Sequence, residues 1–262
     1  MTDMTRTHEL AAKVALVSGS SRGIGKGIAY HLLSRGALVY LTGRSQNELE
    51  QTYDEFRVQF PDQVYKSQGD LSNTATIAGL LKAINNENGH IDIVVANIGS
   101  GRSQMGWNVP DNLWEDCMQI NFMSAVRLSR ESLRYMTDAK KGSIIFIASI
   151  AGVETIAAPA PYACAKAALL SYMKNTAPVA ARYGVRMNAI SPGNIFFPGG
   201  TWDEKIHENP EPTQKYIQDN VPLQRFGTPD DVGSLVCYLA SDDASFISGA
   251  NFIIDGGQTK SI

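Results

Sequence analysis

The stretch Val14-Ala15-Leu16-Val17-Ser18-Gly19-Ser20-Ser21-Arg22-Gly23-Ile24-Gly25 decides how this chain of 262 residues folds. Its first four residues are continuously apolar, which is the pattern of a short strand buried on both faces of a sheet. A turn with three glycines follows and leads into the helical stretch Gly25–Ser34. A strand, a glycine-rich turn and a helix in this order predict the first half of a βαβ unit.

The same alternation continues along the chain. Further strands are expected at Leu38–Thr42, Gln63–Ser67, Ile91–Ala96, Ser143–Ala148, Val185–Ile190 and Asn251–Ile254. Helices are expected at Asn47–Phe60, Thr74–Asn86, Leu113–Tyr135, Ala160–Tyr183 and Asp230–Leu239, with Pro178 expected to kink or shorten the helix that contains it. Since parallel strands are joined by right-handed crossovers, this order predicts an α/β fold with a doubly wound parallel sheet, a Rossmann fold. We expect one domain over residues 1–262, with about seven strands and helices on both faces of the sheet.

Composition excludes several classes of protein. The formal net charge is −3, with no basic tract to predict nucleic-acid binding, and the apolar runs are too short to span a membrane. The N-terminal segment MTDMTRTHEL is polar, so no secretory signal is expected. The scattered residues Cys117, Cys164 and Cys237 predict reduced thiols in a cytoplasmic protein. The four histidines show no ligand spacing, so no metal site is expected: His8, His31, His90 and His207.

The glycine turn predicts a dinucleotide site. Glycines let the backbone approach a pyrophosphate, and the start of the following helix offers free N–H donors with partial positive charge. The spacing is Gly-x3-Gly-x-Gly over Gly19, Gly23 and Gly25, and a glycine-rich stretch by itself is often only a turn. The strand before it and the helix after it favour the dinucleotide interpretation.

The end of the second expected strand bears on which dinucleotide binds. An NAD site usually places an acidic residue there to bond the ribose 2′-hydroxyl. The sequence Leu41-Thr42-Gly43-Arg44-Ser45 has no acid before Glu48. Arg44 and Arg22 instead offer guanidinium contacts to a 2′-phosphate, which favours NADP(H) over NAD(H), unless both are ordinary surface arginines.

A second motif, Tyr162-Ala-Cys-Ala-Lys166, predicts acid–base chemistry. Residues four apart on a helix lie on one face, and a lysine ammonium beside a phenol is expected to lower its pKa. Ser149, at the end of an expected strand, would hold a carbonyl or alcohol oxygen. The alternative is that a tyrosine and a lysine at this spacing simply pack on a solvated helix face.

With the glycine turn, Asn97-Ile98-Gly99, Asn121, Ser149, Tyr162 and Lys166 in this order, the chain resembles a short-chain dehydrogenase/reductase. The resemblance covers nearly the full length and ends at Asp255-Gly256-Gly257, and the overall pattern is similar to 3-oxoacyl-carrier-protein reductases. It implies that Tyr162 is the general acid/base and that Lys166 lowers its pKa and bonds the nicotinamide ribose. It also implies that Ser149 holds the substrate oxygen and that Asn121 anchors a water linking Lys166 to solvent.

The resemblance also implies cofactor contacts. Asp70 and Leu71 match the adenine position, Asn97 and Gly99 flank the cofactor, and Pro192-Gly193 lies along the nicotinamide. The expected cofactor-binding set is Gly19, Ser21, Arg22, Gly23, Ile24, Gly25, Arg44, Asp70, Leu71, Asn97, Gly99, Tyr162, Lys166, Pro192, Gly193 and Ile195. From the residues alone, Asn121 would only bond a neighbouring backbone and Asp70 would only cap a turn.

One departure concerns the nicotinamide carboxamide, which the family usually holds with a Thr at the place occupied here by Phe197. Either Thr201 takes that role through an altered loop, or Asn194 or backbone groups do.

The implied activity is hydride transfer between a nicotinamide and a carbonyl or secondary alcohol. A 3-oxoacyl-thioester reductase, a sugar or polyol dehydrogenase and another ketone dehydrogenase using NAD(P) all fit, whereas a non-catalytic cofactor-binding scaffold or sensor would not need Tyr162 and Lys166. A dehydratase or epimerase of nucleotide sugars would require a longer C-terminal part. The resemblance also implies a homotetramer or homodimer formed through the two long helices.

Two segments are expected to shape the substrate pocket: Ser100–Pro110 and a substrate loop or lid at 194–220, with Gly199-Gly200 as a hinge. Within them, an apolar wall is expected from Met105, Phe196, Phe197 and Trp202. Basic groups that would meet an anion are expected from Arg102, Lys205 and His207, although ordinary loop packing is the alternative for each of the seven residues.

Overall fold

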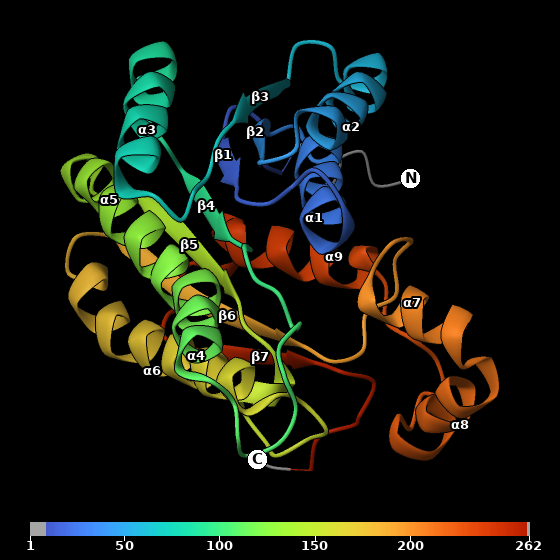
Figure 1. Ribbon diagram of the computed structural model, residues 1–262. Helices are drawn as coiled ribbons and strands as arrows, with labels where there is room; N and C mark the ends of the chain where they lie inside the picture. The colour runs from blue at the N-terminus through green and yellow to red at the C-terminus, as the bar shows by residue number, and fades with distance from the viewer. Residues whose placement is uncertain (1–8, 261–262) are drawn as a thin grey trace.

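The computed structural model describes residues 9–260 and contains one parallel sheet (Figure 1). The strands run in the order β3-β2-β1-β4-β5-β6-β7, and every pairing is parallel. Their bounds are β1 Val14–Val17, β2 Leu38–Gly43, β3 Val64–Gln68, β4 Ile93–Ala96, β5 Gly142–Ile147, β6 Val185–Pro192 and β7 Asn251–Ile254. The predicted doubly wound sheet is confirmed, while His8 and most of the polar N-terminal segment lie outside the described residues.

Helices cover both faces of the sheet. One layer contains α1 Gly23–Ser34, α2 Gln46–Gln59 and α9 Pro229–Ala240; the other contains α3 Thr74–Asn88, α5 Ser124–Ala139 and α6 Ala160–Ala181. Side chains of one strand alternate between the two cores, so Ala15 and Val17 pack on the first layer and Val14 and Leu16 on the second. Continuous apolar strands are therefore required, because both faces are buried.

The long helical region predicted over Leu113–Tyr135 is confirmed, but it is not a regular α-helix throughout. The structure has α4 Asp111–Met118, a π-helical segment η2 Gln119–Met123 and then α5. The widened turn contains Asn121, whose side chain bonds the backbone of Ser100 in the loop after β4 and of Cys117 in α4. π-segments of this kind are frequent at functional sites.

The segment 194–220 is more regular than its composition predicts. It contains α7 Thr201–Glu208 and α8 Pro210–Asn220, which lie beyond the carboxyl edge of the sheet at the lower right of Figure 1. Helix α8 begins at Pro210. Proline is favourable there because a backbone N–H in the first turn of a helix has no acceptor within the helix, so its absence costs nothing. Pro178 is tolerated in the last turn of α6, which ends at Ala181, two residues earlier than predicted.

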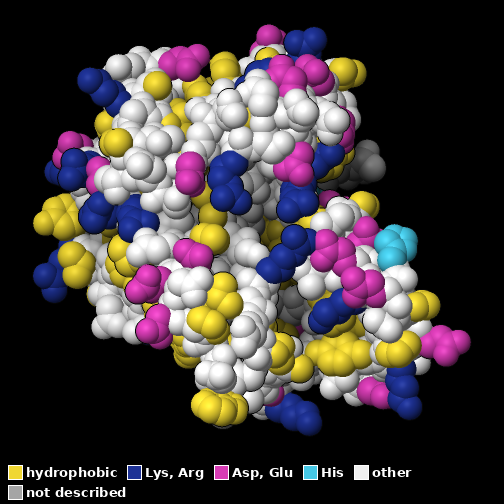
Figure 2. Space-filling model, in the orientation of Figure 1, with side chains coloured by type: hydrophobic (Ala, Val, Ile, Leu, Met, Phe, Trp, Pro, Cys, Tyr) yellow, Lys and Arg dark blue, Asp and Glu magenta, His cyan; other side chains and the backbone are white. Residues whose placement is uncertain are grey.

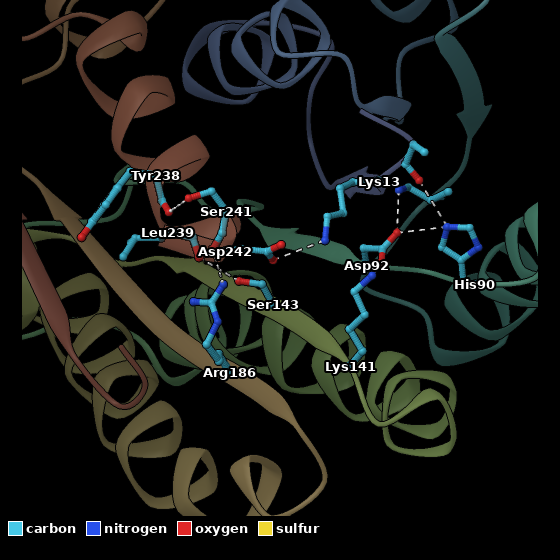
Figure 3. A network of polar contacts seen from close by, with 12 residues as sticks. Lys13, His90, Asp92, Lys141, Ser143, Arg186, Tyr238, Leu239, Ser241 and Asp242 are labelled. Carbon is cyan, nitrogen blue, oxygen red and sulfur yellow. Dashed lines mark hydrogen bonds and ion pairs between the residues drawn. The ribbon is translucent and has the colours of Figure 1, made fainter. Parts of the chain in front are cut away.

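A polar network ties the strands together at the amino edge of the sheet, opposite the glycine turn (Figure 3). The buried carboxylate of Asp92 accepts the N–H of Val14 at 2.9 Å and pairs with Lys141 at 3.0 Å and His90 at 3.1 Å. Lys13 pairs with Asp242 of the short helix η4 Asp242–Ala244 at 3.4 Å. Since Asp92 joins β1, β4 and the start of β5, we assign this network a structural role.

Two further observations concern the described part of the chain. None of its helices is long and apolar enough to cross a membrane, and Cys117, Cys164 and Cys237 are free. Over residues 9–260, no group of three or more side chains is arranged to hold a metal ion.

Candidate active site

A cleft of about 930 Å³ opens at the carboxyl ends of the strands. It extends from the glycine turn, past Ser149 and Tyr162, to α7 and α8. The strand order reverses between β1 and β4, and ligands of open α/β sheets bind in the crevice at such a point. Figure 2 shows basic side chains gathered around the hollow between the body of the molecule and the α7–α8 region.

The glycine turn has the close packing that a dinucleotide cradle requires. Gly19 and Gly23 have positive φ angles of 64° and 56°, and a Cβ on Gly25 would lie 2.2 Å from the carbonyl oxygen of Gly19. No side chain caps the start of α1, so its first N–H groups remain available to an anion. These residues fit a pyrophosphate.

Asn97 supports this turn from β4. Its amide Nδ2 donates to the carbonyls of Ser18 at 3.1 Å and Gly19 at 3.0 Å. Thr42, at the end of β2, accepts the Gly19 N–H at 3.1 Å. Asn97 therefore lies beside the predicted cofactor site, but its side chain is used to fix the turn.

The two arginines predicted to meet a 2′-phosphate line the same cleft. Arg22 is loosely paired with Glu48, with 3.8 Å between Nη1 and Oε1. The carboxylate of Asp70 accepts the Ser72 N–H at 2.9 Å; hydrogen bonds from Ser72 and, to a smaller extent, the charge of Arg44 lower the pKa of Asp70.

Not every expected cofactor residue reaches the cleft. Its wall includes Arg22, Ile24, Arg44, Gly99, Tyr162, Gly193 and Ile195. The lining does not include the others: Gly19, Ser21, Gly23, Gly25, Asp70, Leu71, Asn97, Lys166 and Pro192. Leu71 is only 2% exposed and its side chain belongs to the core, which leaves only its backbone to meet an adenine.

Ser149 and Tyr162 come together at the centre of the cleft. Ser149 follows β5, its hydroxyl accepts the Ala151 N–H at 3.1 Å, and it begins the short helix η3 Ile150–Gly152. Tyr162 lies in the first turn of α6, and both side chains line the cleft. Burial raises the pKa of Tyr162, and a hydrogen bond with Ser149 partly offsets that rise.

The expected lowering of the Tyr162 pKa by Lys166 is not found. The Lys166 ammonium lies 5.8 Å from the centroid of the Tyr162 ring and donates to the carbonyl oxygen of Ile147 at 2.8 Å. Because Lys166 is only 3% exposed, desolvation lowers its own pKa to about 8. The prediction from spacing omitted burial, which acts on both groups and opposes charge on each.

Asn121 and Lys166 converge on Gly99. A Cβ at Gly99 would lie 2.8 Å from Asn121 Oδ1 and 3.0 Å from Lys166 Nζ, so only glycine allows both groups to approach the backbone here. Asn121 accepts the Ser100 N–H at 2.8 Å and donates to the carbonyls of Ser100 and Cys117, both at 3.1 Å. Its amide is thus fixed against the loop after β4.

Sequence reasoning did not identify two of these partners, the Ser100 backbone and the Ile147 carbonyl. A backbone partner carries no signal in its own side chain, so only the fold reveals it.

The place of the missing Thr is occupied by an aromatic ring. Phe197 packs on the glycine turn, and a Cβ on Gly23 would lie 2.7 Å from its ring. Asn194 donates to Gln258 Oε1 at 2.6 Å and is therefore already engaged. Thr201 lines the cleft at the start of α7.

The expected pocket residues divide into two groups. Arg102, Phe197, Trp202 and Lys205 line the cleft. Among the others, Phe196 packs against Phe226, Met105 is exposed, and His207 pairs with Asp203 at 3.5 Å on the outside of α7. The predictions for these three were wrong.

The fold and this site define a nicotinamide-dependent oxidoreductase, and the chain belongs to the short-chain dehydrogenase/reductase family. A family model described as enoyl-(acyl carrier protein) reductase matches residues 19–259. It covers the glycine turn, the Ser149–Tyr162–Lys166 region and helices α7 and α8.

Relatives agree over nearly the whole chain. A 3-oxoacyl-[acyl-carrier-protein] reductase, FabG of Vibrio cholerae, is 36% identical over 95% of this chain and 98% of its own length. A putative gluconate dehydrogenase from Agrobacterium tumefaciens has a TM-score of 0.88 at 27% identity, covering 97% of this chain and 98% of its own. Levodione reductase has a TM-score of 0.88 at 28% identity, covering 95% of this chain and 98% of its own. The chain is thus similar to NAD(P)-dependent dehydrogenases and reductases.

Proposed function

We propose that this chain is an NADP(H)-dependent oxidoreductase that moves a hydride between the nicotinamide and a carbonyl or secondary alcohol. The observation that carries the proposal is one continuous cleft. It is lined by Ser149 and Tyr162 at its centre and by Arg22 and Arg44 near the glycine turn. The separate motifs of the sequence would therefore bind the cofactor and the substrate in the same cleft.

The catalytic residues have distinct roles. Bound NADPH supplies the hydride. Tyr162 gives its proton to the carbonyl oxygen, and burial favours the neutral phenol that this step needs. The Ser149 hydroxyl donates to the same oxygen and stabilises its developing charge. Lys166 bonds the nicotinamide ribose, and Asn121 holds the loop after β4 and anchors a water beside Lys166.

The cofactor is held along the same cleft. The glycine turn and the start of α1 take the pyrophosphate, Arg22 and Arg44 take the 2′-phosphate, and Asp70 and the backbone of Leu71 meet the adenine. Gly193, Ile195 and Thr201 line the cleft and are the groups that we assign to the carboxamide, and Phe197 packs on the glycine turn. The preference for NADP(H) rests on the two arginines, since β2 ends without an acid.

We treat residues 1–262 as one domain with the segment 194–220 as its lid, acting in the cytoplasm as a homotetramer or homodimer. A non-catalytic scaffold is disfavoured because Ser149, Tyr162 and Lys166 are all present. The relatives carry names for different substrates: 3-oxoacyl-[acyl-carrier-protein], gluconate and levodione. A 3-oxoacyl-thioester reductase and a sugar or polyol dehydrogenase are therefore both retained.

The proposal is tested by NADPH oxidation against ketoacyl thioesters, sugars and simple ketones. Tyr162→Phe is expected to lower kcat at least about 100-fold while leaving NADPH affinity nearly unchanged, because the phenol moves the proton but does not hold the phosphates. Near-normal turnover by this variant would show that another group moves the proton.

A further inference from the structure

The end of the cleft beyond the catalytic residues has an electrostatic character that the cofactor does not explain. Among the described residues that line the cleft, four are basic, Arg22, Arg44, Arg102 and Lys205, and one is acidic, Glu208. Arg22 and Arg44 belong to the end beside the glycine turn. Arg102 and Lys205 lie at the substrate end, between the loop after β4 and α7.

Lys205 is an exposed side chain of α7 that packs on an aromatic ring at this end. Its ammonium lies 4.4 Å from the centroid of the Trp202 ring, a distance at which a cation is attracted to the face of an indole. Trp202 in turn stacks on Tyr216 of α8, with 5.4 Å between centroids and an interplanar angle of 23°. The Thr213 hydroxyl donates to the Lys205 carbonyl at 3.0 Å, which fixes the corner between the two lid helices.

Lys205 also differs from its basic neighbour in its partners. Arg102 pairs with Glu204, so the loop after β4 is joined to α7 across the mouth of the cleft. Within residues 9–260, no carboxylate forms an ion pair with Lys205. An ammonium has three donors, and a ring face satisfies none of them as a hydrogen-bond acceptor does.

The contact with the Trp202 ring and the unused donors of its ammonium together make Lys205 a suitable anchor for an anion. A preorganised cation loses little conformational entropy when it binds, and a concave site concentrates its field. The anchor lies in the same cleft as Ser149 and Tyr162, so one ligand can reach both.

We infer that the substrate carries an anionic oxygen group, a carboxylate or a phosphate, remote from the carbonyl, and that Lys205 binds this group. The inference rests on the proposed function, because it assigns the polarity of the substrate of that same site. Lys205 is then a specificity-determining residue, and Arg102, fixed by Glu204, presents its remaining donors from the opposite side.

The test compares charged and neutral carbonyl compounds of matched skeleton. Levulinate is measured against its methyl ester, and dihydroxyacetone phosphate against dihydroxyacetone, so that carboxylate and phosphate are separated. The variants are Lys205→Met, Lys205→Arg and, as a control, Lys215→Met on the outer surface of α8, away from the cleft.

In the wild type, kcat/KM for at least one charged compound is expected to exceed that of its neutral partner. Lys205→Met is expected to reduce this charged-to-neutral ratio about 10- to 100-fold, which is the worth of a hydrogen bond to a charged group. Lys205→Arg is expected to restore part of it, and Lys215→Met to leave the ratio unchanged.

Binding to the NADPH-loaded chain, measured by calorimetry with the same four compounds, separates the two hypotheses. Charged compounds that bind in a Lys205-dependent manner but are never reduced support the inference on the anion and contradict the proposed activity. Three results would overturn the inference on the anion: equal kcat/KM and affinity for charged and neutral compounds, an unchanged charged-to-neutral ratio of kcat/KM in Lys205→Met, or binding of none of the four compounds.

Discussion

The desolvated ammonium of Lys166 leads to a measurable pH dependence of stability. Its pKa is held at about 8 in the folded chain, against an ordinary value of 10.5. Between these values the unfolded chain binds more protons than the folded one, so the free energy of unfolding rises with pH. The full difference corresponds to about 3 kcal/mol, of which about 2 kcal/mol is recovered between pH 7 and pH 10.

The assay is urea unfolding of the wild type and Lys166→Met at pH 7 and pH 10. Other groups titrate over this range in both proteins, so the informative quantity is the stability of the wild type minus that of the variant. We expect this difference to shift by about 2 kcal/mol in favour of the wild type at pH 10. Lys215→Met, which replaces an exposed lysine, serves as the control. A difference that does not change with pH would refute the desolvation of Lys166.

Three further substitutions test the cofactor site and the network at the amino edge of the sheet. Arg44→Asp is expected to weaken NADPH binding far more than NADH binding in fluorescence titrations; an equal loss for both would contradict the 2′-phosphate assignment. Gly25→Ala places a Cβ 2.2 Å from the Gly19 carbonyl oxygen, so the turn must shift, and NADPH is expected to raise the Tm of the variant much less than that of the wild type. Asp92→Asn keeps the shape of the side chain but removes the charge paired with Lys141, and we expect a loss of about 1–2 kcal/mol in unfolding stability. Its kcat should stay near the wild-type value, since Asp92 lies at the opposite edge of the sheet; a large fall would indicate coupling between the two ends.

Local patterns predicted most of the fold. All seven strands lie within a few residues of their expected positions because each apolar run is short and bounded by turn residues. The region around Asn121 is helical as predicted, but its spacing did not reveal the π-segment, in which Asn121 bonds the backbone of Ser100 in the loop after β4. Helices α7 and α8 were not predicted in the segment 194–220, which is rich in proline, glycine and aromatic residues; proline is nevertheless favourable in the first turn of a helix, where Pro210 lies.

The sequence predicted which side chains of the candidate site lie near one another, but not how deeply they are buried. Spacing along a helix correctly placed Tyr162 and Lys166 on one side of α6, and Ser149 follows its strand as expected. The direction of the Tyr162 pKa shift was wrong, because sequence spacing reports proximity but not burial. The positions of Met105, Phe196 and His207 were also wrong, because composition does not show which face of a loop or helix meets the cleft.

The sequence by itself determined the order of strands and helices, the glycine turn and the candidate catalytic side chains, since these depend on short-range periodicity and on residue chemistry. Tertiary structure alone decided the convergence of Asn121 and Lys166 on Gly99 and the packing of Phe197 on the turn. These contacts join segments far apart in the chain, and their energies come from burial and close approach. Burial and close approach exist only once the sheet has brought its carboxyl edge together.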